Sequence, residues 1–210
     1  MPILIYTPAG YETSQKLYPV IYLLHGSDGT AWQWSSDGRM EHLADNLMAA
    51  GRMPEAILVS PDANMPGNSF AAFERYMVEE IIPFVEGRYR TLISPLNRAI
   101  VGVSRGGNQA FHVAFKRPDL FSMLGVFSIN LGVLNSQTYS SLSDVSKVNQ
   151  QIPTFIYAAG TDDNLIPFSS AQAANDKLTQ LGIAHTFLPV RGDHAWHNWR
   201  KLFVDFVGRL

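Results

Sequence analysis

The segment RAIVGVSRGGNQAF, residues 98–111, decides how this chain is expected to fold. Its apolar run Ala99–Val103 is typical of a buried strand, and helical spacing resumes after the following glycines. Between the two, Gly102-Val103-Ser104-Arg105-Gly106 fits the pattern G-x-S-x-G. In the strand-turn-helix context this pattern predicts a nucleophile elbow, a sharp turn that presents a reactive serine.

The physical demands of such a turn account for its glycines. A serine on a sharp strand-to-helix turn is held in strained backbone geometry, and side chains at positions 102 and 106 would collide with their neighbours. The hydroxyl is then exposed at the N-terminus of a helix, where the dipole and free N–H groups favour developing negative charge. The alternative is an ordinary glycine-rich turn with an incidental serine. A nucleophile elbow would require an acid and a histidine downstream, so those residues distinguish the two interpretations.

Short apolar runs alternate with helical patterns along the rest of the chain. The predicted strands are Ile3–Tyr6, Val20–Leu24, Ala56–Ser60, Ala99–Val103, Met123–Ser128, Thr154–Ala159 and Thr186–Pro189. The predicted helices cover about 40–50, 70–90 with a kink or break at Pro83, 105–117, 169–181 and 195–210. This alternation predicts a single α/β domain over residues 1–210, with a mostly parallel sheet and helices on both faces. The polar segment 135–151 is expected to be a loop or a small lid over the sheet edge.

Composition excludes several classes of function. With 46% hydrophobic and 16% charged residues, the chain has enough apolar side chains for a sizeable core. A formal net charge of −2 without any basic block gives no support for a nucleic-acid partner, and apolar runs of only strand length indicate no membrane insertion. The absence of cysteine excludes disulfides, thiolate catalysis and Cys-ligated metals. No signal peptide is expected from the PILIYTP start, and the compartment stays unknown.

A reactive serine needs a base that takes its proton and an acid that orients the base. With a G-x-S-x-G elbow, the acid and then the histidine follow downstream, each after a strand. The strand at 154–159 is followed by Asp162 and Asp163, and the strand that begins at Thr186 is followed by His194 and His197. We favour Asp163, which lies further beyond its strand, and Asp162 remains the alternative.

The two histidines differ in their expected surroundings. His194 follows Gly192-Asp193 in a loop at the start of a helix, which suits a projecting imidazole, so we favour it over His197, which lies one turn into the helix. His194 and His197 with Asp193 also have the spacing of metal ligands. No further ligand cluster accompanies them, and we expect neither a metal nor an organic cofactor.

Two backbone N–H groups are expected to stabilise the negative charge that builds up on a carbonyl oxygen under attack. One belongs to Arg105, the residue after the candidate nucleophile. The other should come from the loop after an early core strand, and the stretch HGSDG at 25–29 follows the strand Val20–Leu24. We assign Ser27 as this second donor. A plain β-turn is the alternative interpretation of HGSDG.

Several blocks of the chain together resemble one known family. These are YTPAGYETSQKLYPVIYLLHG, MEHLADNLMAAGRM, ILVSPDAN, RAIVGVSRGGNQAF, GTDDNLI and GDHAWHNWR, and they occur in the family's order over nearly the whole chain. They are similar to the esterase D-type α/β-hydrolases, nearest to the feruloyl and acetyl-xylan esterase branch. The resemblance implies an α/β-hydrolase fold with little or no cap, a nucleophile at Ser104, an acid at Asp163 and a base at His194. It also suggests a secreted or periplasmic location.

The chain departs from this family in two places. Many members carry Met or another apolar residue after the serine, where this chain has Arg105, whose guanidinium would either contact an acidic substrate or point away. The family also has further N-terminal strands before the YTP block, which here begins at residue 3. The chain is therefore expected to be either a compact member or a fragment with an exposed sheet edge.

These observations predict a serine carboxylesterase that acts on a small-molecule or saccharide ester, such as a feruloyl or acetyl ester of plant polysaccharide. The aromatic residues expected in loops at the active edge, and therefore candidates for lining an acyl or aryl pocket, are Trp32, Trp34, Phe70 and Trp196. An acyltransferase or a thioesterase similar to S-formylglutathione hydrolases would use the same three residues. The non-enzymatic alternative is a binding protein on a decayed hydrolase fold. The oligomeric state is open.

Overall fold

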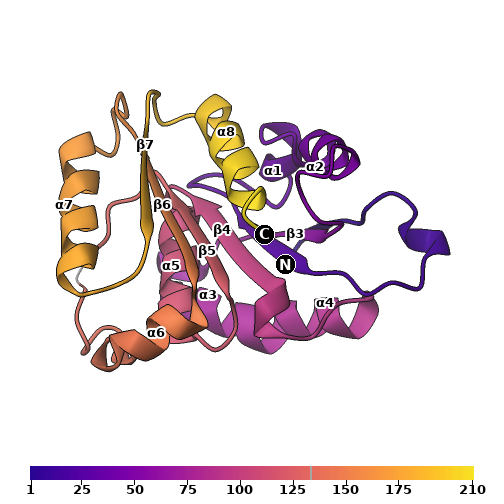
Figure 1. Cartoon of the computed structure of the whole chain (residues 1–210), viewed down its shortest axis with the longest axis horizontal. Helices are drawn as coiled ribbons and strands as arrows, with labels where there is room; N and C mark the ends of the chain where they lie inside the picture. Colours follow the sequence, from indigo (N-terminus) through magenta and orange to yellow (C-terminus); the bar gives the residue numbers. More distant parts are fainter. Residues whose placement is uncertain (133) are drawn as a thin grey trace.

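The described residues, 1–132 and 134–210 of a computed structural model, contain a seven-stranded sheet in the order β1-β3-β2-β4-β5-β6-β7. The strands are β1 (Ile3–Tyr6), β2 (Val20–Leu24), β3 (Ile57–Pro61), β4 (Arg98–Val103), β5 (Met123–Phe127), β6 (Thr154–Gly160) and β7 (Thr186–Val190). β1 pairs with β3 antiparallel, and the other neighbouring pairs run parallel, which confirms the mostly parallel sheet. Because parallel strands end at the same edge, the loops after β2, β4, β6 and β7 lie along one rim (Figure 1).

Helices cover both faces of the sheet (Figure 1). One face packs against α1 (Gln33–Ser36), α2 (Met40–Ala49) and α8 (Trp196–Val207). The opposite face packs against α3 (Phe70–Tyr76), α4 (Ile82–Arg88), α5 (Arg105–Lys116), α6 (Val145–Gln151) and α7 (Phe168–Gln180). This arrangement confirms the expected α/β class with two helical layers.

The two helical layers explain why the strands are apolar at consecutive positions. Along β2, the side chains of Ile21 and Leu23 belong to the core on the α1–α2–α8 side, whereas Tyr22 and Leu24 belong to the core on the other side. Successive side chains of a strand point to opposite faces, so a strand covered on both sides buries every residue. All five residues of β2 are buried accordingly.

The predicted helix at 70–90 is continuous but locally widened. Between α3 and α4, the residues Met77–Ile81 form a π-helical turn, and Pro83 lies at the start of α4. Proline has no N–H to donate to the carbonyl one turn earlier, and a π-turn is a common way to accommodate such a missing bond. Pro83 therefore changes the winding of the helix instead of ending it.

The polar segment 135–151 does not form the lid that its composition allows. A 3₁₀-helix over Ser140–Ser143 leads into α6, whose Val148 is buried in the core. Ser141 Oγ donates a hydrogen bond to the carbonyl of Phe115 at the C-terminal end of α5. The segment therefore lies at the end of α5 remote from Ser104. The side chain of Asp144 caps α6 by accepting a hydrogen bond from Lys147 N–H, a local signal that the sequence interpretation overlooked.

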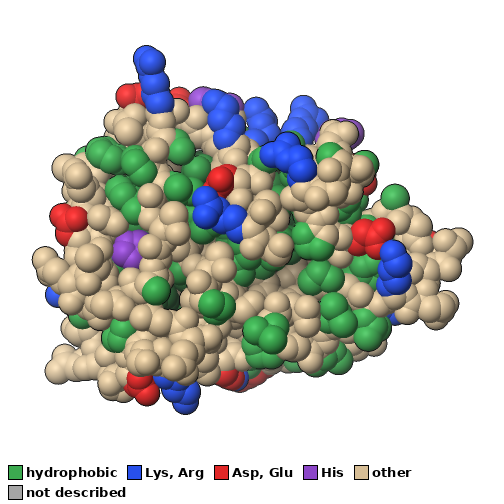
Figure 2. Space-filling view, viewed as in Figure 1, with side chains coloured by type: hydrophobic (Ala, Val, Ile, Leu, Met, Phe, Trp, Pro, Cys, Tyr) green, Lys and Arg blue, Asp and Glu red, His purple; other side chains and the backbone are tan. Residues whose placement is uncertain are grey.

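The surface is of mixed character. Figure 2 shows hydrophobic side chains dispersed over one face, and Lys and Arg side chains gathered along its upper edge, near the start of α8. Within residues 1–132 and 134–210, the structure contains no helix with the length and apolar character needed to cross a bilayer.

The packing of α8 on the sheet gives a test of the fold. Phe206 is fully buried, and a Cβ added at Gly125 of β5 would lie 2.8 Å from its Cε2 atom, so the ring fills the space left by the glycine. Replacing Phe206 by Ala opens a cavity, and we expect Phe206→Ala to lower the free energy of unfolding by about 3 kcal/mol or more in urea denaturation. The control is Leu210→Ala, which changes an exposed residue beyond the same helix. Equal unfolding midpoints for the two variants would contradict this packing.

Candidate active site

The turn at Ser104 has the geometry that its glycines suggest. Ser104 lies between β4 and α5 with φ 53° and ψ −126°, a combination that costs backbone strain in any residue other than glycine. A Cβ at Gly102 would lie 2.2 Å from the carbonyl oxygen of Gly106, and a Cβ at Gly106 would lie 2.3 Å from the carbonyl oxygen of His25. Both positions exclude a side chain, as predicted. The turn leaves the serine partly exposed.

His194 and Asp163 form a hydrogen-bonded pair. His194 Nδ1 lies 2.8 Å from Asp163 Oδ2, with side-chain exposures of 8% and 1%. The other carboxylate oxygen, Oδ1, accepts hydrogen bonds from the N–H groups of Leu165 (2.9 Å) and Ile166 (2.8 Å). Because the carboxylate fixes the proton on Nδ1, the lone pair of His194 lies on Nε2, where a base needs it.

Tight backbone contacts bring the two loops together. β6 and β7 are neighbours in the sheet, and Asp162 N–H donates to the carbonyl of Gly192 at 3.0 Å. A Cβ at Gly160 would lie 2.3 Å from the same carbonyl oxygen. The loop after β6, which carries Asp163, is therefore pressed against the loop after β7, which carries His194.

The imidazole of His194 is also packed against a tryptophan. The rings of His194 and Trp199 meet edge to face, with centroids 5.0 Å apart. Trp199 Nε1 donates a hydrogen bond to Ser128 Oγ at 3.0 Å, just beyond the end of β5. β5 is the neighbour of β4, and Ser104 N–H donates to the carbonyl of Phe127 at 2.8 Å. Trp199 thus connects the histidine loop to the strand end next to Ser104.

The alternative residues from the sequence have other partners. Asp162 is exposed and lies 4.0 Å from the guanidinium of Arg191, and His197 Nε2 lies 3.3 Å from Asp193 Oδ1 with both side chains about half exposed. Nowhere in the described part of the chain do three His, Cys, Asp or Glu side chains cluster so as to hold a metal ion. Across that same part, no hydrogen bond joins Ser104 Oγ to His194. Such bonds are often long in unliganded sites and tighten when substrate binds.

The loop after β2 lies directly against the serine turn. A Cβ at Gly26 would lie 3.5 Å from Ser104 Cβ, so the two predicted oxyanion donors belong to adjoining segments. Arg105 is the first residue of α5, and the first N–H groups of a helix have no intrahelical acceptor. Ser27 is exposed and follows Gly26 directly.

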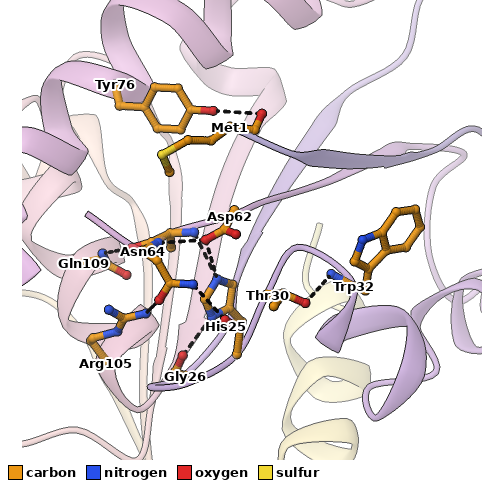
Figure 3. Close-up of polar contacts among 12 residues, drawn as sticks. Met1, His25, Gly26, Thr30, Trp32, Asp62, Asn64, Tyr76, Arg105 and Gln109 are labelled. Atoms are coloured by element: carbon orange, nitrogen blue, oxygen red, sulfur yellow. Dashed lines mark hydrogen bonds and ion pairs between the residues drawn. The ribbon is translucent and has the colours of Figure 1, made fainter. Parts of the chain in front are cut away.

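A polar network behind this loop was not anticipated from the sequence (Figure 3). Ala63 N–H donates to His25 Nε2 at 3.0 Å, so the imidazole carries its proton on Nδ1 and donates to the carbonyl of Gly26 at 2.8 Å. Burial lowers the pKa of His25, which keeps this buried ring neutral. The buried side chain of Gln109 donates to the carbonyl of Ala63 at 2.8 Å.

The four predicted pocket aromatics have different surroundings. Trp34 is fully buried, with its ring 5.1 Å from that of Trp196 and 5.4 Å from that of Phe203, so the prediction that Trp34 lines a substrate pocket is wrong. From the sequence we expect Trp34 in a loop, whereas the residue lies in α1 and its ring is buried in the core. Trp32 is 59% exposed at the start of α1. Trp196 is partly buried against Trp199, and Phe70 is partly buried with its ring 5.8 Å from that of His112.

Comparison with known proteins gives related folds and sequences. The chain is 29% identical over 136 residues to an endo-1,4-beta-xylanase/feruloyl esterase of Xylanibacter ruminicola, a match that covers 59% of this chain and 19% of that protein. The chain thus spans about a fifth of that relative. A ferulic acid esterase of the fungus Anaeromyces mucronatus has a TM-score of 0.83 at 25% identity, covering 98% of this chain and 83% of that one. The same esterase has been solved with ferulic acid.

A third comparison is an S-formylglutathione hydrolase of Staphylococcus aureus, with a TM-score of 0.74, 18% identity and coverage of 98% of this chain and 90% of that chain. These folds confirm the α/β-hydrolase architecture expected from the sequence. Residues 1–210 match the family model described as "Putative esterase". A match over this length shows that the chain belongs to this esterase family.

Proposed function

We propose that the chain is a serine carboxylesterase whose catalytic residues are Ser104, His194 and Asp163. The observation that carries the proposal is the 2.8 Å hydrogen bond from the His194 imidazole to the Asp163 carboxylate. It leaves Nε2 of His194 as the free base and places a buried negative charge where an imidazolium would form. The strained turn at Ser104, at the same rim of the sheet, supplies the nucleophile.

The reaction proceeds in two halves. Ser104 Oγ attacks the ester carbonyl while His194 takes its proton, and the same proton passes to the leaving alcohol as the acyl–oxygen bond breaks. Water then attacks the acyl-enzyme, again losing a proton to His194, and the carboxylic acid leaves as Ser104 Oγ recovers the proton. The Asp163 carboxylate stays ionised throughout and stabilises the imidazolium.

The negative oxygen of each tetrahedral intermediate is bound by the N–H groups of Arg105 and Ser27. The contact between Gly26 and the serine turn supports this assignment, because it brings the loop of Ser27 beside the first turn of α5. Fixed N–H donors aimed at the developing charge supply about 3–4 kcal/mol each of transition-state stabilisation.

For the acyl group we propose an aromatic acid of the feruloyl type. The related enzymes named for ferulic acid support this class, and so does Trp32, a large aromatic side chain that is 59% exposed. Trp32 begins the helix α1, which is joined to the histidine loop by successive ring contacts of Trp34, Trp196 and Trp199. Its ring would therefore offer a fixed apolar face near the rim.

The nucleophile is tested by Ser104→Ala. We expect this variant to lose about 10⁴-fold or more of the kcat for p-nitrophenyl butyrate, because no other hydroxyl occupies the turn. A fluorophosphonate probe should label Ser104 in the wild-type protein and leave the variant unlabelled. Ser140→Ala, at an exposed serine remote from the rim, is the matched control with wild-type rates. Undiminished hydrolysis by Ser104→Ala would refute the proposal.

The two neighbouring aspartates allow a test of the acid. Asp163→Asn should lower kcat by about 10³–10⁴-fold at neutral pH, because an amide favours the wrong tautomer of His194 and does not stabilise its charged form. Asp162→Asn, which changes an exposed carboxylate one residue away, should keep kcat within about twofold of wild type. Steady-state kinetics on p-nitrophenyl acetate distinguish the two, and the reverse order of effects would identify Asp162 as the acid.

The acyl preference is tested at Trp32. We expect Trp32→Ala to raise KM for methyl ferulate by about threefold to tenfold, the loss of one aromatic contact, with little change for p-nitrophenyl acetate. Ile93→Ala, at another exposed apolar residue, is the control. Equal effects of Trp32→Ala on both esters would argue against an aromatic acyl site at this residue.

A further inference from the structure

Arg105 connects the start of α5 to the loop after β3. Its guanidinium donates from Nη2 to Asn64 Oδ1 (Figure 3). It also donates from Nη1 to Asn68 Oδ1 at 2.8 Å, and both asparagines lie in the loop after β3. Its backbone begins α5 directly after Ser104. The guanidinium is therefore held by two neutral amide side chains, partners that the sequence did not indicate.

Asn64 extends this connection to the loop after β2. Its Nδ2 donates a hydrogen bond to the carbonyl of Gly29 at 2.8 Å, and its own N–H donates to Asp62 Oδ1 at 2.9 Å. One amide side chain thus accepts from Arg105 and donates to the loop that carries Ser27. Substituting either member would break a continuous path from α5 to this loop.

The loop of Ser27 has little apolar packing of its own to hold it. Ser27 and Asp28 are exposed, and Asp28 adopts φ 58°, a left-handed conformation that is unfavourable for most residues. The turn hydrogen bond from Gly29 N–H to the Gly26 carbonyl is long, at 3.4 Å. The bonds of His25 and Gln109 fix Ala63 and Gly26, and the bond from Asn64 to Gly29 holds the far end of the loop.

The loop of Asn64 itself also needs Arg105. Gly67 and Asn68 are both left-handed, with φ 63° and 52°. Asparagine tolerates this conformation better than most residues, and the charge-assisted hydrogen bond from Arg105 to its side chain favours it further. A planar guanidinium can reach two acceptors at once, which an ammonium group does less well.

We infer that Arg105 is a positioning residue for the oxyanion hole: through Asn64, and steadied by Asn68, it holds the loop that presents Ser27 N–H beside Ser104. The inference rests on the proposed function for its catalytic consequence, whereas the hydrogen bonds from Arg105 through Asn64 to Gly29 are a property of the fold. Arg105 thus has two separate roles, one for its backbone N–H and one for its guanidinium.

The test compares Arg105→Met, Asn64→Ala and the double variant. Methionine keeps the backbone N–H, the chain length and the helix propensity, and removes only the guanidinium. We expect faster amide hydrogen exchange in segments 26–30 and 62–68 of Arg105→Met, with unchanged exchange in 161–166. kcat for p-nitrophenyl butyrate should fall by about tenfold to a hundredfold with KM within about twofold. Binding of a trifluoromethyl ketone, which forms an oxyanion, should weaken by a similar factor.

Two further comparisons extend the test: kcat of the double variant against the single variants, and kcat of Arg105→Lys, which keeps the positive charge. Because the guanidinium acts through Asn64, the double variant should be no slower than the slower single variant. Arg105→Lys keeps the charge, and it should restore little of kcat, since one ammonium group does not replace the two bonds. The matched control is Arg117→Met, which removes an arginine bound to Asp119 at the other end of α5 and should leave exchange and kcat unchanged.

The outcomes separate this inference from the proposed function. Three results would overturn the positioning role of Arg105. They are wild-type amide exchange and kcat in Arg105→Met, a wild-type kcat in Arg105→Lys, or strictly additive losses of kcat in the double variant. A wild-type protein without hydrolytic activity would refute the proposed function, and the exchange comparison would still decide whether Arg105 holds the loop.

Discussion

The backbone conformation of Ser104 is the constraint on which the rim depends. A non-glycine residue at φ 53° and ψ −126° costs about 1–3 kcal/mol, and such a conformation persists only where its surroundings enforce it. Here β4 is buried over its whole length, Gly102 touches the backbone of Gly106, and the N–H of Ser104 is bonded to β5. The hydrophobic effect that buries β4 therefore offsets the strain at the serine. The other groups of the proposed site must lie close to the turn that Ser104 occupies.

Two separate groups of elements place residues near Ser104. The proposed acid–base pair, His194 and Asp163, rests on β6, β7 and α8, where backbone contacts join the loops and Trp199 packs against the imidazole. The proposed oxyanion side rests on β2, β3 and α5, where hydrogen bonds of His25, Gln109 and Asn64 hold the loops. The first is packed mainly by aromatic rings and the second mainly by polar contacts. A substitution in one is therefore expected to leave the geometry of the other intact.

The sequence allowed the prediction of whatever depends on local pattern or on a short motif. The central strands β2 to β6 were predictable because helices bury both of their faces, which makes these strands largely apolar runs. The ends of the predicted helices 40–50 and 169–181 were predictable because a glycine follows each, and glycine readily adopts the left-handed conformation that ends a helix. Gly51 and Gly182 do adopt it, with φ 65° and 75°. Asp163 was distinguished from Asp162 by its distance beyond the strand and by the family resemblance, and its hydrogen bond with His194 at 2.8 Å agrees with that choice.

The features that the sequence did not reveal depend on contacts between distant residues. Trp34 is buried within α1, whereas Trp32 is exposed directly before it, and a helix of four residues has too little periodicity to predict this difference. The bond between Arg105 and Asn64 joins residues 41 positions apart, and no local pattern links them. An arginine after the serine marked a departure from the related family, but its partners became evident only in three dimensions.

The charge state of His25 completes the electrostatics of the proposed oxyanion side. Its Nε2 must accept from Ala63 N–H, which is possible only for the neutral ring, and burial lowers the pKa in the direction that keeps it neutral. A protonated His25 would instead turn a second N–H toward the N–H of Ala63 and break the contact between the loops after β2 and β3. Arg105 imposes no such condition, because a guanidinium has only N–H donors, and it directs them to Asn64 and Asn68. The loop of Ser27 is thus held by one ring that must accept a hydrogen bond and by one guanidinium that only donates, and each residue type suits its requirement.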